Sequence, residues 1–306
     1  MKTKLTILIA FLGIVTGLQA QTIPGTSIPA DTTFNVPRVW RQIAKNYPDA
    51  KPATDNVPAG VIAGRNLVYA HLPETPFGPR DLHLDLFRPE KPGNYPALVL
   101  VHGGGWRAGD KSLQVPLAQQ IAANGFVTVA VEYQLSLEAK YPAAVHNIKA
   151  AIRWLRANAD KFQVDTAHIA ISGCSAGGQL AALVGMTNDV EQFEGCMGNP
   201  DQSSAVQAVI DIDGVLNFMA PLSLNLQRRP DSPDVQWLEG DFLSRPDRWK
   251  EASSIYWVNE QSVPVMFLNS GFPRFTAGQH EMLFMLNEFG IYNEVHKFDV
   301  QVHPFW

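Results

Sequence analysis

A serine between glycines is the first feature of the sequence that suggests chemistry. Residues 173–177 read Gly-Cys-Ser-Ala-Gly, the G-x-S-x-G pattern, with a predicted strand ending at Ser172 and a predicted helix beginning at Gly178. Glycines on both sides permit a sharp strand-to-helix turn, where a Cβ would collide with neighbouring backbone. The helix also directs its N-terminal amides toward a reacting carbonyl oxygen. We therefore predict Ser175 as a nucleophile for acyl transfer.

A run of three glycines lies upstream of this serine. Residues 102–106 read His-Gly-Gly-Gly-Trp and directly follow the continuous apolar run 97–101. Glycines at the end of a strand leave backbone N–H groups uncovered, as an oxyanion hole requires. The alternative is a flexible turn over which Trp106 packs.

A serine hydroxyl also needs a base, and a histidine near the end of the last strand is expected to provide it. His303 lies just past the predicted strand that ends at Phe298. His296 falls inside that strand, and His280 falls at the start of a helix. We therefore predict His303 as the base, with a surface histidine as the alternative.

Alternating strand and helix patterns follow residue 60, and they predict an α/β fold with a mostly parallel central sheet and helices on both faces. The predicted strands are 82–86, 97–101, 126–131, 169–172, 206–210, 265–268 and 294–298. The predicted helices are 36–46, 115–123, 143–159, 178–186 and 278–289.

The domain organisation follows from the segments that depart from this alternation. Residues 21–60 are a Pro-rich N-terminal extension, and residues 61–306 form the folded domain. Residues 216–262, which follow the predicted strand 206–210, have an aromatic-rich pattern without strands and predict a small helical insertion. This insertion is expected to form either the wall of a pocket or a helical pair on the solvent side.

Composition and the N-terminus limit the compartment and the partners. Residues 1–20 carry Lys2, Lys4, an apolar stretch and a small-residue cleavage site, so we expect a signal peptide, export to the periplasm or medium, and no membrane span after cleavage. An N-terminal anchor is the alternative.

The net charge of -5 and the lack of a basic run exclude nucleic acid as a partner. The two cysteines, Cys174 and Cys196, are too few for a metal–thiolate site. We predict no metal or cofactor and unpaired thiols, with one disulfide as the alternative.

These motifs together resemble the hormone-sensitive-lipase-like and feruloyl/acetyl-xylan esterase branch of the α/β hydrolases, from about Val61 onward. The resemblance rests on HGGGW at 102–106, GCSAGG at 173–178, VEYQLS at 131–136 and YPAA at 141–144. It implies an α/β-hydrolase fold and carboxylic-ester hydrolysis. The implied oxyanion amides are those of Gly104, Gly105 and Ala176.

The sequence departs from the family pattern at three places. Gln134 and Asn147 stand where such enzymes usually carry Arg and Asp, and Arg274 stands where the acid usually follows the strand before last. A further helix usually follows the histidine loop, so we expect the C-terminal helix to be missing.

The acid must therefore come from elsewhere, because it has to accept the imidazole N–H. Glu281, at the start of the next helix, is the favoured candidate, although a helix N-terminus attracts carboxylates in any case. Asp299, Asp213 and Asp211 are the alternatives, and a chain without any acid is also left open.

The resulting hypothesis is an exported serine esterase that removes acetyl or feruloyl groups from plant polysaccharide or oligosaccharide. A lipase or general short-acyl esterase, an exported peptidase, and a hydrolase fold kept as a binding module are the alternatives. The sequence leaves the oligomeric state open.

Overall fold

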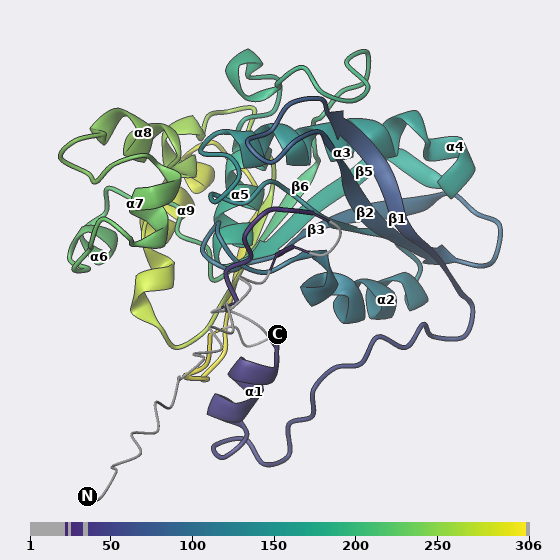
Figure 1. Cartoon of the computed structure of the whole chain (residues 1–306), viewed down its shortest axis with the longest axis horizontal. Coiled ribbons are helices and arrows are strands. Elements are labelled where there is room, and N and C mark those ends of the chain that lie inside the picture. The colour runs from purple at the N-terminus through teal and green to yellow at the C-terminus, as the bar shows by residue number, and fades with distance from the viewer. Residues whose placement is uncertain (1–21, 24–25, 33–35, 304–306) are drawn as a thin grey trace, which may run out of the picture.

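An eight-stranded sheet forms the centre of the chain in a computed structural model that describes residues 22–23, 26–32 and 36–303 (Figure 1). The strand order is β1-β2-β4-β3-β5-β6-β7-β8. Strands β1, β2 and β4 pair antiparallel, and all other neighbours are parallel. The strands are β1 (Val61–Leu72), β2 (Arg80–Pro89), β3 (Tyr95–Val101), β4 (Val127–Val131), β5 (Val164–Cys174), β6 (Ala208–Ile212), β7 (Val265–Asn269) and β8 (Asn293–Lys297). The predicted α/β-hydrolase fold is confirmed.

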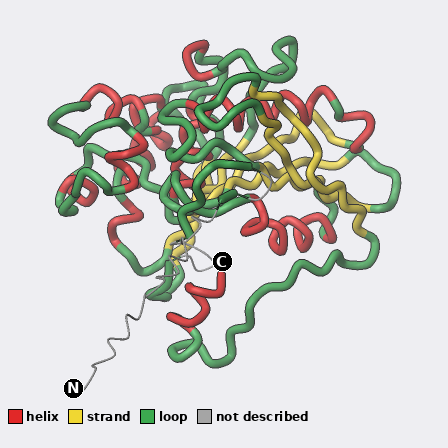
Figure 2. Tube along the Cα trace, viewed as in Figure 1, coloured by secondary structure: helices red, strands yellow, loops and turns green. Residues whose placement is uncertain are grey.

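The central strands are continuous apolar runs because helices cover both faces of the sheet. Every residue of β4 is buried, and so are the last five residues of β3. On one face, α2 (Val115–Ala123) packs against Leu98 and Leu100 of β3. On the other face, α3 (Ala143–Ala157) and α5 (Ala176–Met186) contribute to the larger core. Figure 2 shows helices on both sides of the strands. All residues of α5 are buried, so its position relative to the sheet is firmly defined.

Strand β1 is absent from the sequence prediction because its pattern is interrupted. Its register against β2 shifts between Gly64 and Leu67 and again between Val68 and Ala70. Each shift exchanges the side chains that face the core, so the strict alternation on which the prediction depends is lost.

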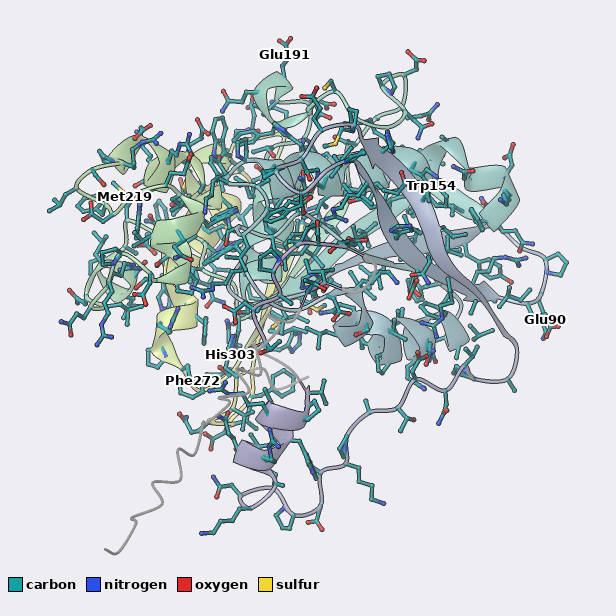
Figure 3. The ribbon with its side chains drawn as sticks, in the orientation of Figure 1. Glu90, Trp154, Glu191, Met219, Phe272 and His303 are labelled. Atoms are coloured by element: carbon teal, nitrogen blue, oxygen red, sulfur yellow. The ribbon has the colours of Figure 1, made fainter. Side chains whose placement is uncertain are left out.

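Short helices between β6 and β7 occupy the segment 216–262. They are α6 (Pro221–Leu224), α7 (Pro233–Trp237), α8 (Pro246–Glu251) and a 3-10 helix η3 (Ser254–Trp257). Three of them begin with proline, which is favoured there because its missing N–H is not needed at the first helical position. Trp237 and Trp249 are fully buried, so this segment packs on the domain and is not a pair of helices on the solvent side. Figure 3 places Met219 of this segment at the opposite end of the molecule from Trp154 of α3.

Three further α-helices belong to the described part of the chain. Helix α1 (Val36–Ile43) matches the predicted helix 36–46, α4 (Ala159–Phe162) follows α3, and α9 (Gln279–Glu288) precedes β8. No helix among the described residues combines the length and apolar character needed to cross a membrane. The predicted signal peptide, 1–20, lies outside the described ranges.

Part of the N-terminal extension packs on the domain. Ile28 is fully buried, and Asp31 forms a parallel β-bridge with Ala108 in the loop after β3. Residues far apart in the chain therefore meet at the carboxyl end of the sheet.

Candidate active site

Ser175 alone separates β5 from α5. Its backbone has φ 58° and ψ -122°, a conformation that costs free energy for any residue other than glycine. The Ser175 N–H donates to the carbonyl of Ile212 on β6 at 2.8 Å, and the Ser175 carbonyl accepts from Gln179 at 3.0 Å. These bonds hold the strained turn and leave the hydroxyl at the end of the sheet.

The two glycines that flank this turn are required by their close approach to backbone. A Cβ on Gly173 would lie 2.1 Å from the carbonyl oxygen of Gly177. A Cβ on Gly177 would lie 2.2 Å from the carbonyl oxygen of Val101 on β3. The sequence argument for these glycines is therefore confirmed.

A hydrogen-bonded chain joins Ser175, His303 and Asp213. His303 Nε2 lies 2.8 Å from Ser175 Oγ, and His303 Nδ1 lies 3.0 Å from Asp213 Oδ2. Asp213 is fully buried and follows β6, and its Oδ1 accepts the N–H of Ser270 at 2.7 Å. This arrangement fixes the imidazole with Nε2 as the acceptor from serine.

The structure corrects the predicted acid. Glu281 is exposed in the first turn of α9, and Asp299 is exposed after β8, whereas Asp213 contacts His303. The helix-dipole alternative stated for Glu281 fits its position. The sequence left Asp213 as an alternative because the distance between β6 and the histidine loop depends on the sheet order.

Asp211, the fourth candidate, has a different environment. It is buried under α5, and its Oδ1 accepts the N–H of Gly214 at 3.0 Å. Burial, and secondarily the nearby Asp213, raises the pKa of Asp211 to about 8. Asp211 is therefore mainly protonated at neutral pH, and Asp213 is the carboxyl group that contacts His303.

The glycine loop approaches Ser175 closely. A Cβ on Gly103 would lie 2.8 Å from the carbonyl oxygen of Cys174 and 3.1 Å from Ser175 Cβ. Gly104 and Gly105 have positive φ angles of 118° and 59° and line the same cavity as Ser175. Within the described residues, the amides of Gly104, Gly105 and Ala176 donate to no backbone carbonyl. The three amides are thus available for an oxyanion, as the resemblance implies.

Trp106 ties this loop to two other elements. Its Nε1–H donates to the side-chain carbonyl of Gln179 on α5 at 2.9 Å, and its ring stacks on Trp237 with centroids 4.8 Å apart. Gln179 in turn donates to the carbonyl of Ala252 at 2.8 Å. The segment 216–262 therefore holds the glycine loop in place, and the alternative of a merely flexible turn does not hold.

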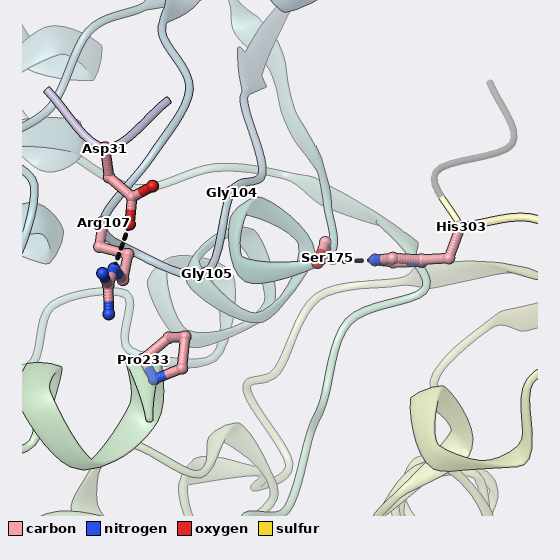
Figure 4. Close-up of a pocket in the computed structure, with 7 residues that line it drawn as sticks. All are labelled: Asp31, Gly104, Gly105, Arg107, Ser175, Pro233 and His303. Carbon is pink, nitrogen blue, oxygen red and sulfur yellow. Dashed lines mark hydrogen bonds and ion pairs between the residues drawn. The ribbon is translucent and has the colours of Figure 1, made fainter. Parts of the chain in front are cut away.

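Two cavities meet at the nucleophile. The first, of about 370 Å³, is lined by Asp31, Arg107 and His303, and the second measures about 260 Å³. Gly105, Ser175 and Pro233 line both, so an ester at Ser175 can extend in two directions. Figure 4 shows the residues that line the first cavity.

The first cavity has a wall that the sequence did not reveal. The Arg107 guanidinium forms an ion pair with Asp31 of the N-terminal extension and donates to Gln236 Oε1 at 3.1 Å. No spacing or motif signals this contact, because Asp31 lies in a segment with little periodicity. Only the docking of the extension brings it to the cavity.

The second cavity contains Arg274 and Phe275, which sequence reasoning also missed as site residues. The Phe275 ring stacks on the His303 imidazole, with centroids 3.8 Å apart and planes inclined by 16°. The Arg274 guanidinium lies 4.8 Å from the centroid of the Phe275 ring. The position directly after β7 was a usable signal, since loops at this edge of a parallel sheet build ligand sites.

The other departures from the family pattern have structural partners. Gln134 and Asn147 are both buried and bind each other: Asn147 Oδ1 accepts the Gln134 N–H at 2.8 Å, and Asn147 Nδ2 donates to Gln134 Oε1 at 3.3 Å. A neutral amide pair thus replaces the expected cation and anion.

The two cysteines are not bonded to each other. Cys174 is buried and Cys196 is exposed, and both thiols are free, so the disulfide alternative is not formed. Burial raises the pKa of the Cys174 thiol.

Comparison with known proteins places these features in a family context. The BD-FAE family model matches residues 84–271. The chain is 31% identical to "Esterase LipC" of Mycobacterium tuberculosis over 71% of its own length and 55% of that protein. It is 32% identical to the "Probable carboxylic ester hydrolase LipM" of the same organism, over 53% of this chain and 40% of that protein. The chain spans about half the length of these curated relatives.

Solved structures share the fold. A "Truncated form of carbohydrate esterase from gut microbiota" superposes with a TM-score of 0.68 and 24% identity, over 80% of this chain and 89% of that one. A "Bifunctional GH43-CE" of Bacteroides eggerthii superposes with a TM-score of 0.67 and 25% identity, over 77% of this chain and 34% of that one. An esterase of Thermogutta terrifontis superposes with a TM-score of 0.61 and 26% identity, over 81% of this chain and 84% of that one.

Proposed function

We propose that this chain, which belongs to the BD-FAE family of α/β hydrolases, hydrolyses carboxylic esters through a covalent acyl-serine intermediate. The single observation that carries the proposal is the hydrogen-bonded chain from Ser175 Oγ through His303 to Asp213, with distances of 2.8 and 3.0 Å. The relatives named as esterases support the same reaction class.

The reaction has two halves. In the first, Ser175 Oγ attacks the ester carbonyl carbon while His303 Nε2 accepts the hydroxyl proton, and the amides of Gly104, Gly105 and Ala176 hold the oxyanion. The tetrahedral intermediate collapses, the C–O bond to the alcohol breaks, and His303 returns the proton to the leaving alkoxide. In the second half, water attacks the acyl carbon while His303 Nε2 accepts a proton from it. The C–O bond to Ser175 Oγ then breaks, His303 returns the proton to Ser175 Oγ, and the carboxylic acid leaves.

Asp213 stabilises the imidazolium that forms in both halves. Its Oδ2 faces the Nδ1–H, and the Ser270 N–H fixes the carboxylate through Oδ1. The groups of this chain, the ester and one water molecule account for every bond and proton in the two halves.

We further propose that the substrate is an acetyl or feruloyl ester of plant polysaccharide or oligosaccharide and that the chain acts outside the cytoplasm. The motif resemblance supports this substrate class, as does the "Bifunctional GH43-CE" at 25% identity. The leader-like residues 1–20 support export.

A general short-acyl esterase is the second candidate function. It is favoured by the Thermogutta terrifontis esterase, whose solved structures at 25% identity hold propionate or butyrate. Both candidates use the same site, so only the acyl and alcohol groups distinguish them.

The first experiment tests the reaction class. The full chain and a Ser175→Ala variant are incubated with a fluorophosphonate probe, and the adduct is located by peptide mass spectrometry. An adduct on Ser175 supports the esterase proposal, whereas folded chain without an adduct favours a binding module.

The second experiment tests the substrate class. Hydrolysis of acetylated xylan and methyl ferulate is compared with that of p-nitrophenyl esters from acetate to decanoate. Preference for the carbohydrate esters supports the first candidate. Preference for simple two- to four-carbon esters supports the second, and preference for decanoate contradicts both.

A further inference from the structure

Arg274 carries a positive charge at the wall of the second cavity. It belongs to a 3-10 helix, η4 (Pro273–Thr276), that follows β7, and it lines the cavity together with Ser175 and Phe275. A cation in this position is within the reach of a substrate that is bound at the nucleophile.

The charged side chains of the two cavities leave the Arg274 guanidinium without an ion pair. Arg107 is paired with Asp31, and Arg228 is paired with Asp234 at 2.6 Å. The Arg274 guanidinium, by contrast, forms neither an ion pair nor a hydrogen bond with any residue in the described part of the chain, and only its backbone carbonyl accepts a bond, from the Ala277 N–H. The lining residues of the two cavities therefore carry one surplus positive charge, although the whole chain has a net charge of -5.

Arg274 is exposed, and its contact with Phe275 links it to the reacting groups. Its guanidinium lies over the Phe275 ring at 4.8 Å, and this ring stacks on the His303 imidazole at 3.8 Å. Partial desolvation lowers the pKa of Arg274, Asp234 raises it and Arg228 lowers it. Arginine stays protonated in such a site, so the charge remains available to an anion.

We propose that Arg274 binds a second, uncleaved carboxylate of the substrate, so that the enzyme acts on acidic esters. This inference rests on the proposed esterase function and narrows its substrate class. A guanidinium binds a carboxylate through two parallel hydrogen bonds, and one surplus charge matches one carboxylate. The carboxylate comes either from the acyl half, as in a half-ester of a dicarboxylic acid, or from the alcohol half, as in an acetylated uronic acid.

The test compares matched pairs of esters that differ in one carboxylate. Monoethyl glutarate against ethyl butyrate tests the acyl half. Mono-acetylated methyl glucuronoside against mono-acetylated methyl glucoside tests the alcohol half. Initial rates at pH 7 in a pH-stat give kcat/KM for each ester, and the ratio of the acidic to the neutral member measures the preference.

We expect the native chain to prefer the acidic member of one pair, and the pair identifies the half that carries the carboxylate. Arg274→Gln should lower this preference about 10- to 100-fold, as expected for a hydrogen bond to a charged group. Arg274→Lys keeps the charge but loses the planar fork, so its preference for the acidic ester should lie between those of the native chain and Arg274→Gln. Arg229→Gln is the matched control, because Arg229 is exposed and lines neither cavity, so its preference should equal that of the native chain.

Two results would overturn the inference while the esterase function stands. One is hydrolysis of the neutral esters without preference for either acidic partner. The other is an unchanged preference in Arg274→Gln. Failure to hydrolyse any of the four esters, together with no fluorophosphonate adduct on Ser175, would overturn the proposed function itself.

Discussion

Asp213→Asn is the most informative substitution in the site, because it changes the charge beside His303 and keeps the shape. In the native chain, Asp213 Oδ1 accepts the Ser270 N–H at 2.7 Å and Oδ2 faces His303 Nδ1 at 3.0 Å. The Ser270 N–H needs an acceptor, so the carbonyl oxygen of the introduced amide should take the place of Oδ1. The NH₂ group of that amide must then face His303 Nδ1.

This orientation reverses the histidine tautomer. Nδ1 has to accept from the amide, so the proton moves to Nε2, which then donates toward Ser175 and cannot take its proton. The imidazolium also loses its buried counter-ion. In serine proteases the equivalent change lowers kcat by about 10⁴, which corresponds to about 5.4 kcal/mol of transition-state stabilisation. We expect a loss of the same order here, since Asp213 is fully buried and its geometry is the same in kind.

The assay is the kcat/KM for p-nitrophenyl acetate together with the rate of fluorophosphonate labelling of Ser175. Glu281→Gln is the matched control, because Glu281 is exposed on α9, and it should stay within about twofold of the native rate. Retention of more than about a tenth of the native activity by a folded Asp213→Asn chain would refute the assignment. An equal loss in Glu281→Gln would refute it as well.

Three further predictions concern groups around the site. The folded-state pKa of Asp211, about 8, exceeds its unfolded value of about 3.9. The folded chain therefore binds more protons between these values, and stability should fall as pH rises from about 4 to about 8. In urea unfolding, Asp211→Asn should reduce the fall of the free energy of unfolding with pH. An equal fall in the native and variant chains would contradict the raised pKa of Asp211. Ellman's reagent should titrate one thiol, Cys196, in the folded chain and two after denaturation, and none after denaturation would indicate a disulfide. Arg107→Gln should raise KM roughly fivefold to tenfold with kcat nearly kept, because a charge-assisted bond of about 1 kcal/mol that fixes the cavity wall is lost; an unchanged KM would contradict this role.

Local patterns in the sequence were sufficient for much of the fold. The apolar run at β3 and the helix at α5 were predicted because burial on both sides leaves an unbroken apolar signal. Strand β1 was missed because its two register shifts erase the alternation that identifies a half-buried strand. The helices of segment 216–262 are short, and their packing on Trp106 depends on residues distant in the chain.

The sequence by itself determined the nucleophile and its base. The Gly-x-Ser-x-Gly turn admits few backbone conformations, and His303 follows the last strand in the order that the mechanism needs. These choices depend on neighbouring residues and on chain order, both of which a sequence displays.

Only the tertiary structure decided between the acids and supplied the cavity walls. Asp211 and Asp213 are two residues apart, yet one packs under α5 and is mainly protonated, while the other leaves the end of β6 with φ 52° and reaches His303. Asp31 and Arg274 reach the cavities through the docked extension and the loop after β7. Their roles depend on distances between segments remote in the chain, and these distances are set by the sheet order and by packing.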